Sequence, residues 1–267
     1  MNRISALLGM TLMVCSLGLA QDANSERVVV PARDATHARK VDVSLMGGSI
    51  TVKSYAGKEV IVEARGRHAE RDTGKAPEGM HRLDLPERGL SVEEQNNVVT
   101  VRMQRAQHGE LVISVPPDTS LTLRNLNGEI AVEGVKGELD VSSHNGKIDL
   151  TNVSGSVLAN TMNGAMKVTM DSVDPNKPLS FSSMNGTIDV TVPADFKANV
   201  KLRTDHGSIY SDFDFQLGGG AITEKNDTPD GKFKVKIDRT ITGTINGGGT
   251  EATFKTYNGT IYLRKKK

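Results

Sequence analysis

Apolar residues occupy alternate positions along much of this chain, and in its middle part the alternation repeats with a fixed period. The hexapeptide Asn127-Gly128-Glu129-Ile130-Ala131-Val132 returns at 145–150 and, after an equal interval, at 163–168. Half-steps that begin with glycine lie between these copies, at 137–141 and 155–159. Because apolar residues two positions apart line one face of a strand, each unit is predicted to be one short strand and one turn, roughly nine residues long. Such short periods are typical of β-solenoids or hairpin arrays and lie far below those of helical repeats.

Less regular copies extend the pattern in both directions. A degenerate copy occupies 47–52, and further copies begin at Asn185, His206 and Asn258. The spacing between copies becomes longer and less even after Asn163. We therefore expect the array to start early and to continue toward the C-terminus with extended turns.

Two polar insertions interrupt the alternation. Charges, glycines and prolines crowd together over 65–88, which predicts a long exposed loop, and 218–231 is a second, glycine-rich interruption. Further strands are predicted at 41–45, 59–64, 90–92, 98–103, 111–115, 233–237 and 240–245. The organisation expected after residues 1–20 is a single elongated β-repeat domain over 21–267, less regular over 28–115, regular over 116–211 and interrupted over 212–267.

Each Asn-Gly pair is predicted to form a corner, because Asn tolerates a positive φ and Gly adopts one without penalty. The alternative would make the asparagine side chains a ladder of ligands. Alternation then predicts a buried row of Ile130, Ile148, Met166, Ile188, Ile209 and Ile261, with Val132, Leu150, Val168, Val190 and Leu263 beside it. The residues just before the corners form a lining or edge row of Leu126, His144, Met162, Met184 and Tyr257. The outward row contains Ala131, Asp149, Lys167, Asp189, Tyr210 and Tyr262.

One alternative to a solenoid follows from the same pattern. Asn-Gly between alternating apolar residues is also the best short-range signal for an antiparallel hairpin, so a β-meander would produce the same spacing. The half-steps favour an all-β solenoid, a β-helix or a prism-like stack. Pairing at a separation of one full period would indicate stacked coils, and antiparallel pairing centred on Asn127, Asn145 and Asn163 would indicate hairpins.

The first twenty residues have the pattern of a signal peptide. Arg3 precedes an apolar run from Ile4 to Leu19, and Gly18-Leu19-Ala20 places small residues before the expected cleavage at Gln21. The alternatives are an uncleaved anchor and a lipoprotein site at Cys15, the chain's one cysteine. Cleavage predicts an exported protein that is periplasmic, at the cell surface or extracellular, with no disulfide and no transmembrane segment in the mature chain.

Composition and charge narrow the set of partners. The 267 residues include 33 Lys+Arg and 32 Asp+Glu, and removal of Arg3 with the signal leaves 32 of each. This balance provides no general field for nucleic acid, so no nucleic-acid partner is expected. Aromatic residues make up 4% and tryptophan is absent, which fits thin layers of aliphatic side chains better than a deep globular core.

Candidate chemistry is sparse. A polysaccharide-cleaving solenoid needs carboxylates that converge on one face, and the nearest candidates are Asp140, Asp149 and Asp189, with Lys147 and Lys167 in adjoining positions. No metal-binding spacing occurs among His37, His68, His81, His108, His144 and His206. The glycine triplets lack the residues of a phosphate loop, and no serine occupies a nucleophile elbow. We assign no catalytic, cofactor-binding or metal-binding residue, and expect no cofactor.

The repeated N-G-x-I-x-V steps, with half-steps such as Val135 to Val141, resemble the bacterial DUF4097 family of adhesin-like β-strand-repeat proteins. The resemblance is specific from about Val112 to Ser211, where Val115 to Leu121 also resembles the segment that precedes that family's array. It implies a right-handed or prism-like β-solenoid that is exported and has a non-catalytic role at the envelope or cell surface. The family has no agreed catalytic residues, so none is transferred to this chain.

Two functions from different classes follow as hypotheses. The first is a non-enzymatic envelope or cell-surface protein that presents β faces and loops to a glycan, a cell-envelope component or a protein. The second is a carbohydrate-active enzyme, a polysaccharide hydrolase or lyase, on a β-helix scaffold. The oligomeric state is not indicated by the sequence.

Overall fold

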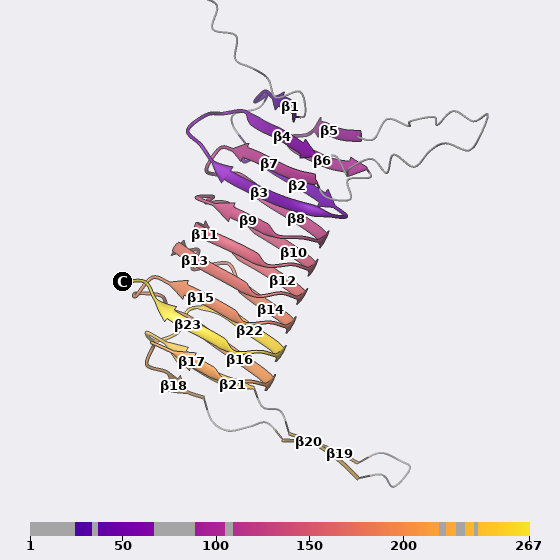
Figure 1. Cartoon of the computed structure of the whole chain (residues 1–267). Helices are drawn as coiled ribbons and strands as arrows, with labels where there is room; N and C mark the ends of the chain where they lie inside the picture. The colour runs from indigo at the N-terminus through magenta and orange to yellow at the C-terminus, as the bar shows by residue number, and fades with distance from the viewer. Residues whose placement is uncertain are drawn as a thin grey trace, which may run out of the picture.

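The computed structural model describes residues 25–33, 37–66, 89–104, 109–218, 223–227, 233–237 and 240–267. Within these ranges every regular element is a β-strand and none is a helix. Two long sheets lie face to face, and successive coils of the chain stack along them (Figure 1). The predicted signal peptide with Cys15, most of the predicted 65–88 loop and part of the 218–231 interruption lie outside the described residues.

Sheet A has ten strands and forms one face of the stack. Their spatial order is β1 (Ser25–Val30), β4 (Val60–Gly66), β7 (Gly109–Val115), β3 (Gly48–Ser54), β9 (Ile130–Glu133), β11 (Ile148–Gly155), β13 (Met166–Val173), β15 (Ile188–Val192), β23 (Ile261–Lys265) and β17 (Ile209–Ser211).

Sheet B has eleven strands and forms the opposite face. Their order, from the same end of the stack, is β5 (Gly89–Gln95), β6 (Val98–Gln104), β2 (Lys40–Leu45), β8 (Ser120–Asn127), β10 (Leu139–Asn145), β12 (Val157–Asn163), β14 (Leu179–Asn185), β22 (Thr250–Asn258), β16 (Ala198–His206), β21 (Ile241–Ile245) and β18 (Gln216–Leu217).

The central strands pair in parallel with the partner one coil away. Ile130 pairs with Ile148 in sheet A, and Leu121 pairs with Leu139 in sheet B, so in both sheets the partners are one sequence period apart. The predicted solenoid is therefore confirmed, and the meander is wrong for the central array. Each coil contributes one strand to each sheet, so the short strand-and-turn unit of the sequence is half a coil.

The stacking order departs from the chain order at both ends. Coil β6/β7 packs outside coil β2/β3, although it follows it in the chain. At the other end, the C-terminal coil β22/β23 lies between coil β14/β15 and coil β16/β17, where Figure 1 shows its yellow strands among orange ones. Asn258 therefore pairs with both Asn185 and His206, so the last copy in the sequence lies between two copies that precede it.

Antiparallel strands cover most of the terminal edges. β1 and β4 close one end of sheet A, β5 closes the same end of sheet B, and β21 with β18 closes the other end of sheet B. The sheets still end in the edge strands β1, β17, β5 and β18, and a strand as short as the two-residue β18 limits pairing with other chains. The strand predicted at 233–237 is present as β20 (Phe233–Ile237), but it pairs only with β19 (Thr223–Asp227) and does not continue the array.

The N-terminal end contains a buried ion pair. Arg39 and Glu94 have side chains only 7% exposed, with Nη2 of Arg39 3.4 Å from Oε1 of Glu94. The Arg39 guanidinium also donates to the backbone carbonyls of Val30, Pro31 and Lys58. Because one side chain reaches β1, the turn before β4, and β5, it holds together the three segments that close this end.

The core lies between the two sheets. The predicted buried row is confirmed except at Ile209, which is only partly buried because β17 is the edge strand of sheet A. From sheet B, Phe181 and Phe254 stack at 5.2 Å between ring centroids. This contact joins coil β14/β15 to the inserted C-terminal coil.

The corner glycines are required by close packing more than by a positive φ. Gly146, Gly164, Gly186 and Gly207 have no positive φ, so the conformational reason expected from the sequence is wrong for them. A Cβ on Gly146 would collide with the carbonyl oxygen of Gly128, and the same collision recurs at the other corners. Backbones of neighbouring coils approach so closely that only hydrogen fits between them.

The corner asparagines form a hydrogen-bonded ladder. Four Nδ2 groups donate to Oδ1 of the asparagine in the adjacent coil at 2.8–2.9 Å, in the order Asn258, Asn185, Asn163 and Asn145, and the ladder ends at Oδ1 of Asn127. Beneath them, polar side chains donate to corner glycine carbonyls, as Thr256 Oγ1 does to the oxygen of Gly186 at 3.1 Å. The asparagine amides bond chiefly to one another, which accounts for their recurrence without a ligand.

Candidate functional site

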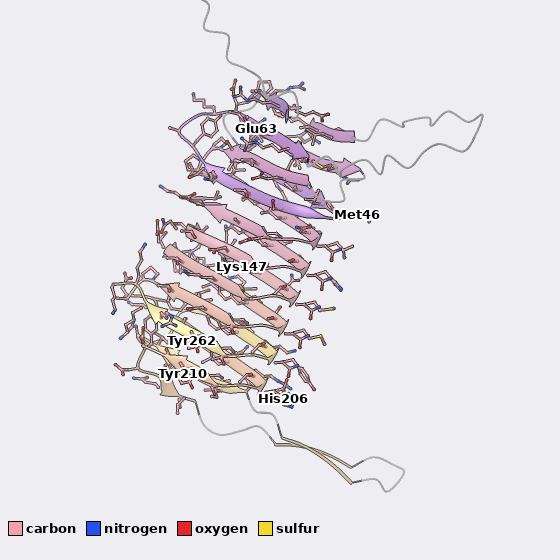
Figure 2. The ribbon with its side chains drawn as sticks, in the orientation of Figure 1. Met46, Glu63, Lys147, His206, Tyr210 and Tyr262 are labelled. Carbon is pink, nitrogen blue, oxygen red and sulfur yellow. The ribbon has the colours of Figure 1, made fainter. Side chains whose placement is uncertain are left out.

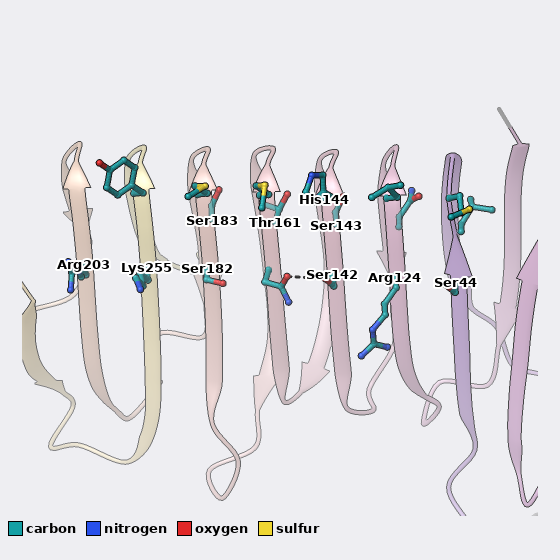
Figure 3. A pocket seen from close by; sticks show the side chains of 18 of the residues that line it. Ser44, Arg124, Ser142, Ser143, His144, Thr161, Ser182, Ser183, Arg203 and Lys255 are labelled. Atoms are coloured by element: carbon teal, nitrogen blue, oxygen red, sulfur yellow. Dashed lines mark hydrogen bonds between the residues drawn. The ribbon is translucent and has the colours of Figure 1, made fainter. Parts of the chain in front are cut away.

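A long groove runs over the outer face of sheet B, beside the corners. Its volume is about 900 Å³, and it crosses β2, β8, β10, β12, β14, β22 and β16 (Figure 3). With ~4.8 Å between neighbouring strands, these seven strands extend over about 29 Å. The groove therefore runs along the stack and perpendicular to the strands.

One side of the groove is an exposed row of mostly apolar side chains, which we call the apolar ridge. Its members precede the corner position of each coil: Met46, Leu126, His144, Met162, Met184 and Tyr257. The ridge points outward because its residues alternate with the buried polar residues beneath the corners. Met46 is 74% exposed and projects from the edge of the stack in Figure 2, and Met184 is 51% exposed. The lining role predicted for this row, including His144, is confirmed.

The floor of the groove is a second row, two residues before the ridge, which we call the polar row. It comprises Ser44, Arg124, Ser142, Asn160, Ser182, Lys255 and Arg203. Ser142 Oγ donates to Asn160 Oδ1 at 2.9 Å, the contact dashed in Figure 3. The row thus provides hydroxyl and amide groups in its middle and cations toward its ends.

The cations of the polar row differ in their partners. Arg124 lies 3.3 Å from Asp140, and Arg203 lies 3.0 Å from Asp205. Lys255 is exposed and forms no ion pair within the part of the chain that the structure describes. Lys255 is therefore the cation most available to a bound molecule.

The structure does not bring together the three aspartates that were candidates for acid–base chemistry. Asp140 is on β10 in sheet B, whereas Asp149 and Asp189 share the outer row of sheet A, on β11 and β15, two strands apart with Lys167 between them. Each carboxylate has its own cation: Arg124 for Asp140, Lys147 for Asp149 at 2.8 Å and Arg264 for Asp189 at 2.8 Å.

These contacts also perturb the cations. The hydrogen bond from Lys147 to Asp149 is the main cause of a raised pKa at Lys147, and the bond from Arg264 to Asp189 raises the pKa of Arg264. Both cations are stabilised in the charged form, as expected of surface ion pairs. Among the residues that line the groove, Asp205 is the one carboxylate.

A second surface feature lies on the outer face of sheet A. Tyr210 and Tyr262 stack at 5.4 Å between ring centroids, and the Arg264 guanidinium lies 4.8 Å from the Tyr262 ring (Figure 2). Both tyrosines belong to the predicted outward row, which this face confirms as a mixture of charged and aromatic side chains. Because Arg264 is also bound to Asp189, the cluster is internally satisfied.

The histidines are dispersed. His144 lies on the apolar ridge, and His206 follows Asn258 at the end of the corner row. His37 accepts a hydrogen bond at its backbone oxygen from Asn97, while His68, His81 and His108 lie outside the described residues. Within the described ranges no cluster of three or more His, Cys, Asp or Glu could hold a metal ion.

The family model described as Toastrack DUF4097 matches residues 28–263. The chain belongs to the Toastrack DUF4097 family. Two solved structures align with it at 10% sequence identity. A "putative cell adhesion protein" from Clostridium sporogenes ATCC 15579 shares the general fold, with a TM-score of 0.52 over 91% of this chain and 99% of its own. A "putative adhesin" from Bacteroides fragilis NCTC 9343 has a TM-score of 0.41, over 91% and 98%. No curated protein matches the chain.

The Toastrack array also shows which residues the sequence did not reveal. The polar row was missed, although its members stand three positions before each corner residue, as Ser142 stands before Asn145. That position varies among Ser, Asn, Arg and Lys, so it has no pattern until stacking aligns the coils. None of the Toastrack segments that the structure describes contains a helix suited to crossing a bilayer.

Proposed function

We propose that this Toastrack protein is a non-enzymatic binding module that acts at the bacterial envelope or cell surface and holds an extended partner in the groove of sheet B. The observation that carries the proposal is the apolar ridge. Its methionines are 41% to 74% exposed, in a line along a groove of about 900 Å³. Contiguous exposed apolar surface with a polar border is characteristic of interaction sites.

Export is part of the proposal. It is supported by the signal-peptide pattern of residues 1–20 and by the cell-adhesion name given to the Clostridium sporogenes protein of the same fold. Hydrogen-bond ladders and stacked apolar rows hold the described coils together without a disulfide, which suits an exported chain whose one cysteine lies in the predicted signal.

The enzymatic alternative has weaker support. Hydrolysis of a glycosidic bond requires two carboxyl groups across one bound sugar, about 5–10 Å apart. Asp205 is the one carboxylate that lines the groove, and it is paired with Arg203. A polysaccharide hydrolase or lyase would need a second acid that this surface does not place opposite the first.

The test compares the mature chain, residues 21–267, with two double variants. Met162→Asp/Met184→Asp places two charges on the ridge. Thr169→Asp/Thr191→Asp places two charges on the outer face of sheet A in coils β12/β13 and β14/β15, which also carry the ridge methionines. Binding of fluorescent protein to intact bacterial cells is measured by flow cytometry, together with release of soluble sugar.

We expect the ridge variant to lose at least about tenfold in cell binding, because two buried apolar contacts become charged. The sheet A variant should bind as the wild type does, and no sugar should be released. Equal binding by the ridge variant and the wild type would exclude the groove as the binding surface. Release of sugar by the wild-type protein would replace the proposal with an enzymatic function, and a wild-type protein that binds no cell would overturn it.

A further inference from the structure

The residues that line the groove repeat once per strand. Each of the seven strands presents one residue of the polar row, and six of them carry a ridge residue two positions on, whereas β16 carries Asp205 there, because parallel pairing keeps the coils in register. The repeat distance is the strand spacing of ~4.8 Å. A ligand that meets each strand in the same way must have nearly the same repeat along its length.

This period discriminates between extended polymers. An extended peptide presents side chains on one face every ~6.6–6.8 Å, because alternate residues point to opposite faces. Such a chain would lose register with the strands after one or two steps. One pyranose unit of a linear glycan advances by about one strand spacing, so each ring can lie over one strand. In a β-1,4-linked chain alternate rings are turned over, so like edges recur at every second strand and the register is still kept.

The two rows also match the two surfaces of a sugar ring. A pyranose has an apolar face of C–H groups and an edge of hydroxyl groups. The Met162 and Met184 thioethers can pack against C–H groups, since methionine adapts to irregular apolar surfaces. The neighbouring Ser142, Asn160 and Ser182 supply donors and acceptors for hydroxyl groups.

The charges select the kind of glycan. Three cations line the groove, Arg124, Arg203 and Lys255, against the single carboxylate of Asp205. Arg124 is neutralised by Asp140 beyond the lining, so the remaining positive charge lies at Lys255. A ligand with carboxylate groups complements this surface better than a neutral one.

We propose that the groove binds a linear glycan whose sugar units carry carboxylate groups, with about one sugar per strand and the chain running from β2 to β16. The inference rests on the proposed binding function and specifies its partner. Lys255 binds a carboxylate, the polar row binds hydroxyl groups and the apolar ridge packs against the faces of the rings.

The experiment measures, by calorimetry on the mature chain, binding of β-1,4-linked mannuronate oligomers that increase in length from two to ten sugars. The matched neutral ligands are β-1,4-linked mannose oligomers, and oligoglutamate serves as an acidic peptide. Affinity for the acidic glycan should increase with length to about seven sugars and then level off, since seven strands cross the groove and each is expected to contact about one sugar. The neutral oligomers should bind roughly fivefold more weakly, the effect of one exposed ion pair.

Two variants locate the contacts. Lys255→Ala should reduce affinity for the acidic glycan to that for the neutral one, while Lys167→Ala, which removes an exposed lysine on sheet A, should have no effect. Met162→Ser/Met184→Ser should weaken both glycans by about tenfold. Thermal unfolding of each variant verifies that the fold is retained.

The outcomes separate this inference from the proposed function. If ridge variants lose cell binding but no acidic oligomer binds, or oligoglutamate binds in its place, the glycan assignment is overturned and the binding module stands. Affinity that increases without a plateau, or an equal effect of Lys167→Ala, would indicate nonspecific attraction of a polyanion and would also overturn it. If the ridge variants still bind cells normally, the proposed function itself fails.

Discussion

The central coils and the two ends of the stack differ in how their strands obtain partners. In the centre, coils β8/β9 to β14/β15 stack in the order in which the chain makes them, and every coil resembles its neighbours. At each end of the stack, the coil nearest the chain terminus is not the outermost one. Coil β6/β7 packs outside β2/β3, and coil β16/β17 packs outside β22/β23. Propagation of the array thus needs only a repeat, whereas closure needs contacts that no repeat contains.

The inserted terminal coils have two neighbours each. β22 pairs with β14 on one side and β16 on the other, and β2 pairs with β6 and β8. A terminal coil at the edge would have one neighbour and a free end, which favours fraying. Insertion therefore gives β22 and β23 a partner on both sides, whereas β1 lies at the edge of sheet A and pairs with β4.

The largest effect should come from truncation at the C-terminal end. Removing residues 250–267 deletes coil β22/β23, exposes Phe181 and leaves coil β16/β17 without its parallel partner. We expect the segment from 194 onward to lose protection in hydrogen exchange. Removing residues 139–156, one complete coil, should keep the fold, because Val157 is the structural equivalent of Leu139. Similar damage from both deletions would remove the distinction between centre and ends.

The N-terminal closure should depend on its buried ion pair. Arg39→Met leaves the buried Glu94 carboxylate with one ion-pair partner, the exposed Arg33 at 3.4 Å, and should lower the free energy of unfolding by about 3 kcal/mol. Arg39→Met/Glu94→Leu should recover most of this loss, because no charge is then buried. Urea denaturation measures both. A double variant as unstable as the single one would show that packing of the arginine stem, and not charge, holds this end.

The central coils should depend on their corner glycines. Gly146→Ala directs a Cβ into the carbonyl oxygen of Gly128, with an expected cost of about 3 kcal/mol in urea denaturation. Gly247→Ala is the matched control, since Gly247 has a φ of +85° and no atom within 4 Å of an added Cβ. It should cost about 1 kcal/mol, the penalty of a left-handed residue. The reverse order would mean that conformation, and not coil spacing, selects glycine.

The smallest effect should be a pH dependence at Lys147. Its pKa is raised above the ordinary 10.5, chiefly by the hydrogen bond to Asp149. The stabilisation is therefore complete below 10.5 and is lost as pH increases through the folded-state pKa, and because the side chain is exposed it amounts to less than about 1 kcal/mol. Lys147→Ala should remove this component from the stability measured between pH 9 and 12. An unchanged slope would assign the alkaline transition to other groups.

Much of the fold could be predicted because each coil repeats one local rule. Alternation at Ile130 and Val132, repeated one period later at Ile148 and Leu150, sets both the strand and its buried face. The ridge could be predicted in the same way, since Met162 and Met184 stand just before corner asparagines. The polar row could not, because Ser142 and Lys255 share no residue type and become neighbours of the same groove only through stacking.

The sequence by itself determined the all-β solenoid, its period and its core, since periodic burial is a local property that every coil shares. It also predicted that Asn-Gly marks the corners. The tertiary structure decided why glycine is needed there, because the clash with the adjacent coil exists only after stacking. It decided where the terminal coils insert and how Arg39 meets Glu94, which is far from it in the chain. These contacts join segments that are not copies of the repeat. They form only when the folded coils pack together, so the periodic pattern of the sequence does not predict them.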